Sequence, residues 1–385
     1  MHPVSEHVPA PQPAPVFDGH NDLPWALRQD FGYSVAAATL DQGQPRLHTD
    51  IPRLHAGGVG AQFWSVFVPS TLAPAESAVA TLEQIDCVRR IVDAHPDTFE
   101  LATSAAEVRA AVARGRIASL MGAEGGHSIA GSLAVLRMLA DLGVRYMTLT
   151  HNDDLPWATS ATGALMERGA DPGLSPFGRE VVAEMNRIGM LVDLSHVSPQ
   201  TMLDALAATT RPVVFSHSST RAVCGHPRNV PDEVLELLPA NGGVLMVTFV
   251  PKFVSEACRE HALAVRDRRR ELGLPTGFHD VAPEEDPDAA AEFAEWLGAH
   301  PAPEATIDDV VRHLEHSRDV VGPQHLGLGG DFDGTTDLPR GMDGVAGYAP
   351  LLAALTERGW AREDLDALCF GNAMRVLEAA EAPQS

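Results

Sequence analysis

The feature that most constrains the fold of this chain is a regular alternation of short apolar runs with amphipathic stretches. Eight apolar runs read as β-strands, at residues 16–20, 61–68, 117–122, 146–150, 190–194, 213–216, 244–249 and 326–330. Strands that alternate with helices form a parallel sheet. Eight such units predict an α/β fold of the (β/α)₈ TIM-barrel type, with functional residues on the loops after the strands. An open, doubly wound sheet is the alternative.

Helix signals fill the gaps between these runs. Residues 132–142 carry apolar side chains at helical spacing and stop at Gly143. Ser198 precedes Pro199, a combination typical of a helix start, and Thr306 can cap a helix over 307–321. These signals support helical crossovers between the strands.

One segment breaks the alternation. Residues 255–303, between the seventh and eighth apolar runs, are charged and rich in proline, and they predict a helical insertion over or beside the barrel mouth. The proline-rich residues 1–14 predict a flexible N-terminal arm. The remaining residues, 15–385, are predicted to form a single metallohydrolase barrel domain.

Charge and composition exclude several classes of partner. The formal net charge of −24 argues against binding to nucleic acid, which needs a basic surface, and against anionic membranes. No signal peptide and no apolar stretch long enough for a membrane span is evident. The four cysteines form no C-x-x-C pair and are expected to be buried, reduced thiols. A cytoplasmic location is therefore predicted.

Polar residues that can bind metal follow four of the apolar runs. His20 and Asp22 form a His-x-Asp pair at the end of the first, Glu124 follows the third among small residues, and His196 and His217 follow the fifth and sixth. Alone, each has a structural explanation, such as a helix cap or a hydrogen-bonded core histidine. Because the carboxyl ends of barrel strands converge, the coincidence favours a metal site. Imidazole and carboxylate suit Zn²⁺.

The lysine content limits which residues could bridge two metal ions. The chain contains one lysine, Lys252, among its 28 basic residues. Many barrel hydrolases bridge their metals with a carboxylated lysine, and here only Lys252 follows a predicted strand. A bridge, if one exists, must therefore be Glu124, which could share two metals with a hydroxide.

The eighth apolar run leads into Asp331-Phe332-Asp333-Gly334-Thr335. Asp331 is predicted to be the proton shuttle, and Asp333 a turn residue beside Gly334. The stretch also resembles the nucleophile loop of haloacid-dehalogenase-type phosphatases. That loop normally opens its domain and needs a downstream lysine, whereas here about 50 residues follow and none is lysine. We therefore reject that interpretation.

Two further residues are candidates for substrate contacts. His151, after the fourth run, could stabilise an oxyanion. Arg228, after the sixth, could hold a substrate carboxylate through a bidentate fork. Spacing alone leaves open a helix cap or a surface ion pair for each.

Together these motifs carry a family resemblance. In chain order they are Phe17-Asp18-Gly19-His20-Asn21-Asp22, Glu124-Gly125-Gly126, Leu149-Thr150-His151-Asn152, Asp193-Leu194-Ser195-His196, Ser216-His217-Ser218, His226-Pro227-Arg228-Asn229 and Gly330-Asp331-Phe332-Asp333-Gly334. They resemble the ordered motifs of the renal (membrane) dipeptidase family, and the chain is similar to a bacterial-type member within the amidohydrolase-like metal-dependent hydrolases. The resemblance runs from Phe17 to about Glu378.

The resemblance implies a role for each motif. His20 and Asp22 would bind one zinc ion, His196 and His217 a second, and Glu124 would bridge the two Zn²⁺ per chain. His151 and Arg228 match substrate-binding positions, and Asp331 matches the catalytic acid.

The implied activity is that of a binuclear zinc metallo-dipeptidase. Such an enzyme hydrolyses free dipeptides, both L-L and L-D, through a metal-bridging hydroxide. The resemblance also suggests a homodimer. Two alternatives stay open: a metal-dependent lactonase, β-lactamase-like or other amide hydrolase, and a metal-bearing scaffold without activity.

The chain departs from the family in three respects. Phe370-Gly371-Asn372 stands where family members often carry Gly-Gly-Asn. The insertion at 255–303 is longer than in the mammalian enzymes, so side-chain preference cannot be carried over. The mammalian secretion and anchoring signals are not evident.

Overall fold

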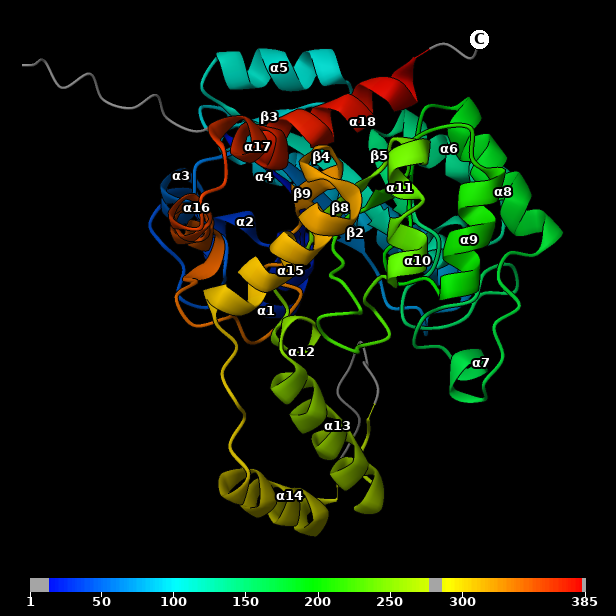
Figure 1. The fold of residues 1–385 in the computed structure, drawn as a ribbon, viewed down its shortest axis with the longest axis vertical. Helices are drawn as coiled ribbons and strands as arrows, with labels where there is room; N and C mark the ends of the chain where they lie inside the picture. The colour runs from blue at the N-terminus through cyan, green and yellow to red at the C-terminus, as the bar shows by residue number, and fades with distance from the viewer. Residues whose placement is uncertain (1–13, 277–285, 383–385) are drawn as a thin grey trace, which may run out of the picture.

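The barrel is the core of the molecule. The computed structural model describes residues 14–276 and 286–382, in which eight parallel strands close into a barrel surrounded by helices (Figure 1). Around the barrel the strands are β2 (Val59–Phe67), β1 (Val16–Asn21), β9 (Leu326–Leu328), β8 (Val244–Val247), β7 (Val214–Phe215), β6 (Leu191–Asp193), β5 (Val144–Thr148) and β4 (Ile117–Glu124). Pairing of β2 with β4 closes the ring. The predicted (β/α)₈ fold is confirmed.

A ninth strand was not expected from the sequence. β3 (Phe99–Leu101) pairs with residues 117–119 at the start of β4, and the later part of β4 pairs with β5 (Val144–Thr148). β3 lies between helices α4 (Pro74–Ala94) and α5 (Ala105–Ala113). β3 extends the sheet beyond the start of β4. Its three residues are too few to show a periodic pattern, so the sequence did not predict it.

Several predicted strands end earlier in the structure than in the sequence pattern. Hydrogen bonding in β6 stops at Asp193 and in β9 at Leu328, although the apolar runs continue to 194 and 330. Past these points the chain leaves the ladder and turns into the barrel mouth. The segments that leave the ladder carry the candidate site residues.

The three helices with clear start signals begin at the predicted residues: α6 (Leu133–Asp141), α9 (Pro199–Ala208) and α15 (Ile307–Val321). The hydroxyl groups of Ser132 and Ser198 accept hydrogen bonds from backbone N–H groups three residues on. Thr306 and Asp309 cap α15 reciprocally. Each cap satisfies N–H groups that the helix leaves free.

Two apolar layers stabilise the barrel. One lies between strands and helices, and the other fills the interior with Phe17, Phe63, Leu120, Tyr146, Val214, Val244 and Met246. Helix α18 (Asn372–Glu381) packs against the interior layer through Met374 and Leu377. It crosses the barrel end where the strands begin, because Arg375 donates to the carbonyl of Gly242, just before β8. The opposite end, where the strands finish, is left open for the site.

The charged insertion is helical, as expected. After β8 and the short α12 (Pro251–Val254), helices α13 (Glu256–Glu271) and α14 (Pro287–Ala299) extend away from the barrel on its mouth side (Figure 1). Arg268 pairs with Glu292 across the two helices, and Arg269 lies 5.1 Å from the ring of Phe293.

Two other sequence expectations bear on the environment of the chain. All four cysteines are buried and free, as predicted. None of the described helices has the length and apolar character needed to cross a bilayer. The predicted arm lies almost wholly outside the described residues, which begin at residue 14.

Candidate metal centre

Five potential metal ligands meet at the mouth of the barrel. His20 lies in β1 and Asp22 directly after it, Glu124 is the last residue of β4, and His196 and His217 follow β6 and β7. All five side chains are buried. Residues from the ends of four strands, up to about 200 positions apart in the sequence, thus lie close together in the structure.

Glu124 stands at the centre of this group. Its Oε2 lies 3.3 Å from Nε2 of His20, which is itself 3.2 Å from a carboxylate oxygen of Asp22. Its Oε1 lies 3.0 Å from Nε2 of His196 and 3.4 Å from Nε2 of His217. The two oxygens of one carboxylate therefore face two separate sets of donors.

These separations match those between ligands of one metal ion. Zinc bonds of about 2.0–2.2 Å in tetrahedral geometry place neighbouring ligand atoms about 3.3 Å apart. Nε2 of His20 and Oδ1 of Asp22 are buried without a hydrogen-bond partner among the described residues. Burying such groups unpaired is costly unless a cation joins them. The nitrogen and oxygen donors present here fit a pair of zinc ions.

Tyr146 fixes the orientation of His20. The phenol hydroxyl lies 2.8 Å from Nδ1 of His20 and donates its own hydrogen to the carbonyl of Gly19. The hydroxyl must then accept from Nδ1–H, which leaves the lone pair of Nε2 directed at the centre. Gly122 makes room for this ring, since a Cβ at that position would lie 2.0 Å from it.

A second relay orients His217. Nδ1 of His217 lies 2.8 Å from Oγ of Ser216, which donates to Asp193 at 2.6 Å. Thr148 donates to the same carboxylate oxygen at 2.6 Å, and the backbone N–H of Ser195 donates to the other. Because Ser216 gives its hydrogen to Asp193, it accepts from Nδ1–H, and Nε2 of His217 is left unprotonated.

The protonation equilibria agree with a cation-binding role. Burial lowers the pKa of His196 and His217 well below the usual value, so both imidazoles are neutral. Burial also opposes protonation of His20, but Tyr146 and Glu124 raise its pKa well above the usual value. A bound cation can take the place of that proton.

His151 and Arg228 border the ligands. Nε2 of His151 lies 3.8 Å from Oε1 of Glu124, and burial lowers the pKa of this imidazole to about 4. Arg228 is buried, and its guanidinium makes only long hydrogen bonds, of 3.4 Å to Ser218 and 3.3 Å to the carbonyl of His217. Its Nε has no partner among the described residues, so the group retains capacity for an anion.

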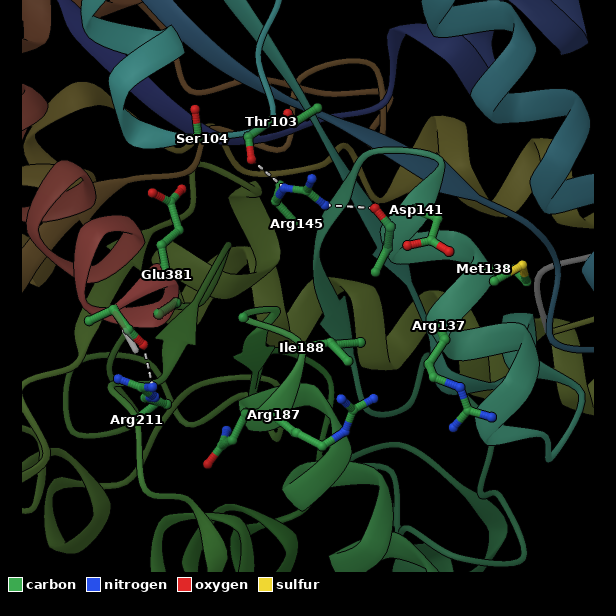
Figure 2. A pocket seen from close by; sticks show the side chains of 15 residues that line it. Thr103, Ser104, Arg137, Met138, Asp141, Arg145, Arg187, Ile188, Arg211 and Glu381 are labelled. Atoms are coloured by element: carbon green, nitrogen blue, oxygen red, sulfur yellow. Dashed lines mark hydrogen bonds between the residues drawn. The ribbon is translucent and has the colours of Figure 1, made fainter. Parts of the chain in front are cut away.

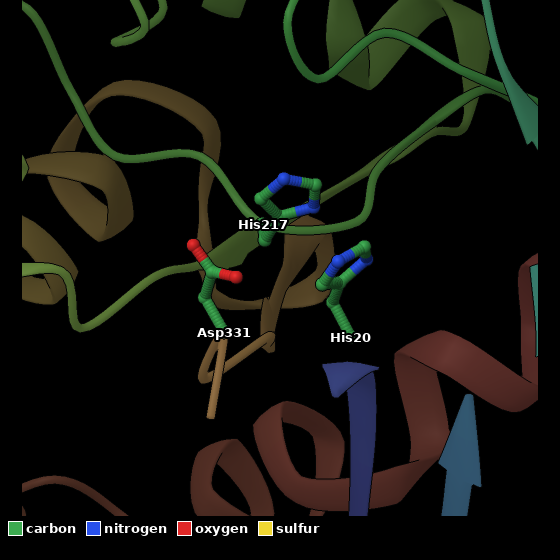
Figure 3. A group of neighbouring side chains, drawn as sticks. All are labelled: His20, His217 and Asp331. Carbon is green, nitrogen blue, oxygen red and sulfur yellow. The ribbon is translucent and has the colours of Figure 1, made fainter. Parts of the chain in front are cut away.

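Asp331 completes the group from the loop after β9. Figure 3 shows its carboxylate directed towards the rings of His20 and His217. The backbone is left-handed here, with φ of 60°, and its N–H donates to the carbonyl of His20. Burial raises the pKa of Asp331 above its usual value. A non-glycine residue held in this conformation is common at functional sites.

Asp333 plays a different part, as the sequence suggested. It also has a positive φ, of 65°, and its carboxylate accepts the backbone N–H of His48 at 2.6 Å. In return its own N–H donates to Nδ1 of His48. Asp333 thus ties the loop after β9 to His48.

All eight predicted site residues therefore lie in one group. Sequence reasoning missed their supporting partners, above all Tyr146, Asp193 and Ser216. Tyr146 sits within an apolar run and reads as core. Asp193 and Ser216 precede predicted ligands by a few residues, and that proximity was the only available signal.

A cavity of about 720 Å³ lies apart from these residues, and Figure 2 shows side chains that line it, among them Arg137, Arg145, Arg187 and Arg211. Four arginines line it, but their guanidinium groups are occupied. Arg145 and Arg211 donate to backbone carbonyls, and Arg137 and Arg187 share Glu184. This cavity therefore offers less for chemistry than the mouth does.

Comparison with known proteins points the same way. A family model described as membrane dipeptidase, peptidase family M19, matches residues 9–385. A metallopeptidase from Rhodobacter sphaeroides, solved with a phosphinate mimic of L-Ala-D-Ala, is 25% identical with a TM-score of 0.76, over 96% of this chain and 100% of that one. Dipeptidase AC, a metallopeptidase of family M19, is 25% identical with a TM-score of 0.77, over 96% and 99%.

A probable dipeptidase from Pseudomonas aeruginosa, PvdM, is similar in fold. Its TM-score is 0.80 at 22% identity, over 96% of each chain. At this identity the similarity concerns the fold alone.

Proposed function

The chain belongs to the membrane dipeptidase family, peptidase family M19, a family of metallopeptidases, and on this premise we propose that it is a binuclear zinc enzyme that hydrolyses free L-L and L-D dipeptides. The observation that carries the proposal is the position of Glu124, whose two oxygens face two separate sets of ligands. The relative solved with a mimic of L-Ala-D-Ala supports the inclusion of L-D substrates.

Five residues would hold the metal. His20 and Asp22 would bind one zinc ion, His196 and His217 the other, and Glu124 would bridge them, as the distances from its two oxygens suggest. When bound, the zinc ions would lower the pKa of a water molecule and polarise the scissile carbonyl group. Tyr146 and the Ser216–Asp193 pair would keep both imidazoles in the tautomer that presents Nε2.

Arg228 would define the length of the substrate. Its guanidinium is buried, contacts the backbone of the predicted ligand His217 and has free donor capacity, and a planar fork suits a carboxylate. If it pairs with the free C-terminal carboxylate, a longer peptide would have to bury an uncharged peptide group there instead. The enzyme would therefore be restricted to dipeptides.

His151 and Asp331 would act on the reacting atoms. Water adds to the scissile carbonyl carbon, and the neutral His151 donates a hydrogen bond to the oxygen that becomes negative. Asp331 accepts the proton that the water loses and transfers it to the amine nitrogen as the C–N bond breaks. Its raised pKa suits a group that must both take up and release a proton near neutral pH.

The proposal is tested by hydrolysis of a panel of L-L and L-D dipeptides with zinc-loaded protein and a chelated control. We expect turnover that is lost on chelation and returns with zinc. No turnover by protein that holds two zinc ions per chain would contradict it, and activity on lactones or other amides instead would assign a different substrate class.

A further inference from the structure

The only lysine of the chain lies at the barrel mouth. Lys252 is the second residue of α12, which directly follows β8. Its Nζ lies 5.5 Å from the centroid of the Phe253 ring, and Cζ of Arg228 lies 5.5 Å from the same centroid. Two cationic groups therefore flank one aromatic ring, and one of them is the proposed binding partner of the substrate C-terminus.

The two cations differ in their exposure. Arg228 is 2% exposed, whereas Lys252 retains contact with solvent. Desolvation by the surrounding protein nevertheless lowers the pKa of Lys252. The negative charge of Asp331 raises this pKa, and the positive charge of Arg228 lowers it further. Lys252 is therefore a solvated cation inside a concave site, close enough to the candidate catalytic residues to sense their charges.

No ion pair satisfies Lys252 within residues 14–276 and 286–382. Two other basic side chains near Lys252 are engaged. Arg340 pairs with Glu304 at 3.3 Å, and Nε2 of His261 lies 2.9 Å from the carbonyl oxygen of His300. Besides Arg228, which the proposed function assigns to the substrate C-terminus, Lys252 is thus a cation that remains available to a ligand.

Beside Lys252 there is room for a substituent. A cavity of about 520 Å³ lies between α12, the start of α13 and the loop over 335–340. Besides Lys252, the polar residues Thr335, Thr336 and Arg340 line it. Two carboxylates line it as well, and both are engaged: Glu304 pairs with Arg340, and Asp337 accepts a hydrogen bond from the hydroxyl group of Thr336. The cavity could hold an amino-acid side chain with an anionic end.

On the premise of the proposed function, we propose that Lys252 selects dipeptides whose C-terminal residue carries an acidic side chain. Arg228 would bind the main-chain carboxylate, which every dipeptide has, and Lys252, equally close to the Phe253 ring, would bind the side-chain carboxylate. A flexible, solvent-exposed ammonium group suits a side chain that varies between substrates. When a substrate has no acidic side chain, the ammonium group stays hydrated, so leaving it unpaired costs little free energy.

A purely electrostatic role through Asp331 is the competing explanation. If Lys252 served only to adjust the proton affinity of Asp331, its removal would affect all substrates equally and shift the pH profile of kcat. A substrate-binding role instead changes KM for acidic substrates and leaves neutral ones unaffected.

The experiment compares zinc-loaded wild-type protein with Lys252→Met on L-Ala-L-Asp, L-Ala-L-Asn and L-Ala-L-Ala. Asn has nearly the shape of Asp without its charge, so the ratio of kcat/KM for the Asp and Asn substrates isolates the charge. We expect this ratio to fall about tenfold in Lys252→Met, through KM, as for the loss of a charge-assisted hydrogen bond. Lys252→Arg should retain the ratio, and Lys252→Glu should favour L-Ala-L-Lys.

Arg340→Met is the matched control, because it removes an exposed cation from the same cavity wall that already has a partner. It should leave the ratio unchanged. An unchanged ratio in Lys252→Met, or an equal loss on all three substrates with a shifted pH profile, would overturn the proposal. Failure of wild-type protein to cleave any of the three would instead contradict the proposed function, and this proposal with it.

Discussion

Glu124 illustrates how one side chain can determine the chemistry of a site. Oε2 lies 3.3 Å from Nε2 of His20, Oε1 lies 3.4 Å from Nε2 of His217, and Ser65 donates to Oε2 at 3.0 Å. Desolvation alone would raise the pKa of such a carboxyl group, yet the surrounding histidines hold it well below the usual range. The charge is therefore kept in place for a cation.

Replacing Glu124 with Gln removes that charge at nearly constant shape. We expect zinc affinity to fall at least about 100-fold, because changes in groups that merely support ligands already cost 10–100-fold. Most dipeptidase activity should be lost with it. Zinc titration by calorimetry measures the change, with Glu180→Gln on the exposed face of α8 (Pro176–Arg187) as the control. Unaltered affinity and full activity in Glu124→Gln would refute the bridging assignment.

Arg228 gives a prediction about substrate length. Arg228→Met should raise KM for dipeptides about 100-fold or more, since removing one partner of a buried charge pair costs about 2–5 kcal/mol. Dipeptide amides, which lack the carboxylate, should be affected far less. The test measures KM and kcat/KM of the wild type and of Arg228→Met on one dipeptide and on its C-terminal amide. Equal losses of kcat/KM on both substrates would show that Arg228 does not bind the substrate carboxylate.

At the scale of elements, much of the site was readable because strand ends in a closed barrel converge. His20 ends one apolar run, and Glu124 and His217 each follow one, so the proximity of the three side chains could be predicted from these runs and the barrel fold together. The role of Tyr146 and the presence of strand β3 could not be predicted from the sequence pattern. A tyrosine within an apolar run has the pattern of a core residue, and three residues between two helices carry no period. The positive φ of His196 and Asp331 depends on tertiary contacts, which the sequence pattern does not encode.

β4 supplies a prediction of its own. Ala at Gly122 would place a Cβ 2.0 Å from the Tyr146 ring, and this ring must then move away from Nδ1 of His20. We expect Gly122→Ala to destabilise the protein by about 1–3 kcal/mol and to weaken zinc binding by about 10–100-fold.

Gly298→Ala in α14 is the control, because nothing lies within 4 Å of its added Cβ. It should be neutral or slightly stabilising. Thermal unfolding and zinc titration provide both readouts. A Gly122→Ala protein with wild-type stability and zinc affinity would show that Tyr146 does not position His20.

At the scale of the whole molecule, the connections around the barrel depend on a buried neutral histidine. His313 in α15 accepts the backbone N–H of Thr220 at Nδ1, at 3.1 Å, and lies 3.1 Å through Nε2 from the carbonyl oxygen of Val254. It thereby joins the segments after β7 and β8 to one helix. A protonated imidazole would oppose the N–H of Thr220, and burial lowers the pKa of His313 to about 4.

This gives stability a defined pH dependence. Between pH 6.5 and 4 the unfolded chain binds a proton at His313 that the folded protein does not, so the free energy of unfolding falls as pH falls. The contribution reaches about 3 kcal/mol by pH 4 and is absent above pH 6.5. In chelated protein, the stability difference between wild type and His313→Gln should therefore shrink over this interval. A pH-independent difference, matching that of the exposed control His55→Gln, would contradict a buried neutral His313.

We propose that two zinc ions bind to the group of ligands around Glu124, one to each oxygen of its carboxylate. Anomalous diffraction at the zinc absorption edge, from crystals of zinc-loaded protein, tests it most directly. We expect two peaks about 3.5–4 Å apart, one beside His20 and Asp22 and the other beside His196 and His217, each in contact with one oxygen of Glu124. A single peak, or two peaks that Glu124 does not bridge, would contradict it.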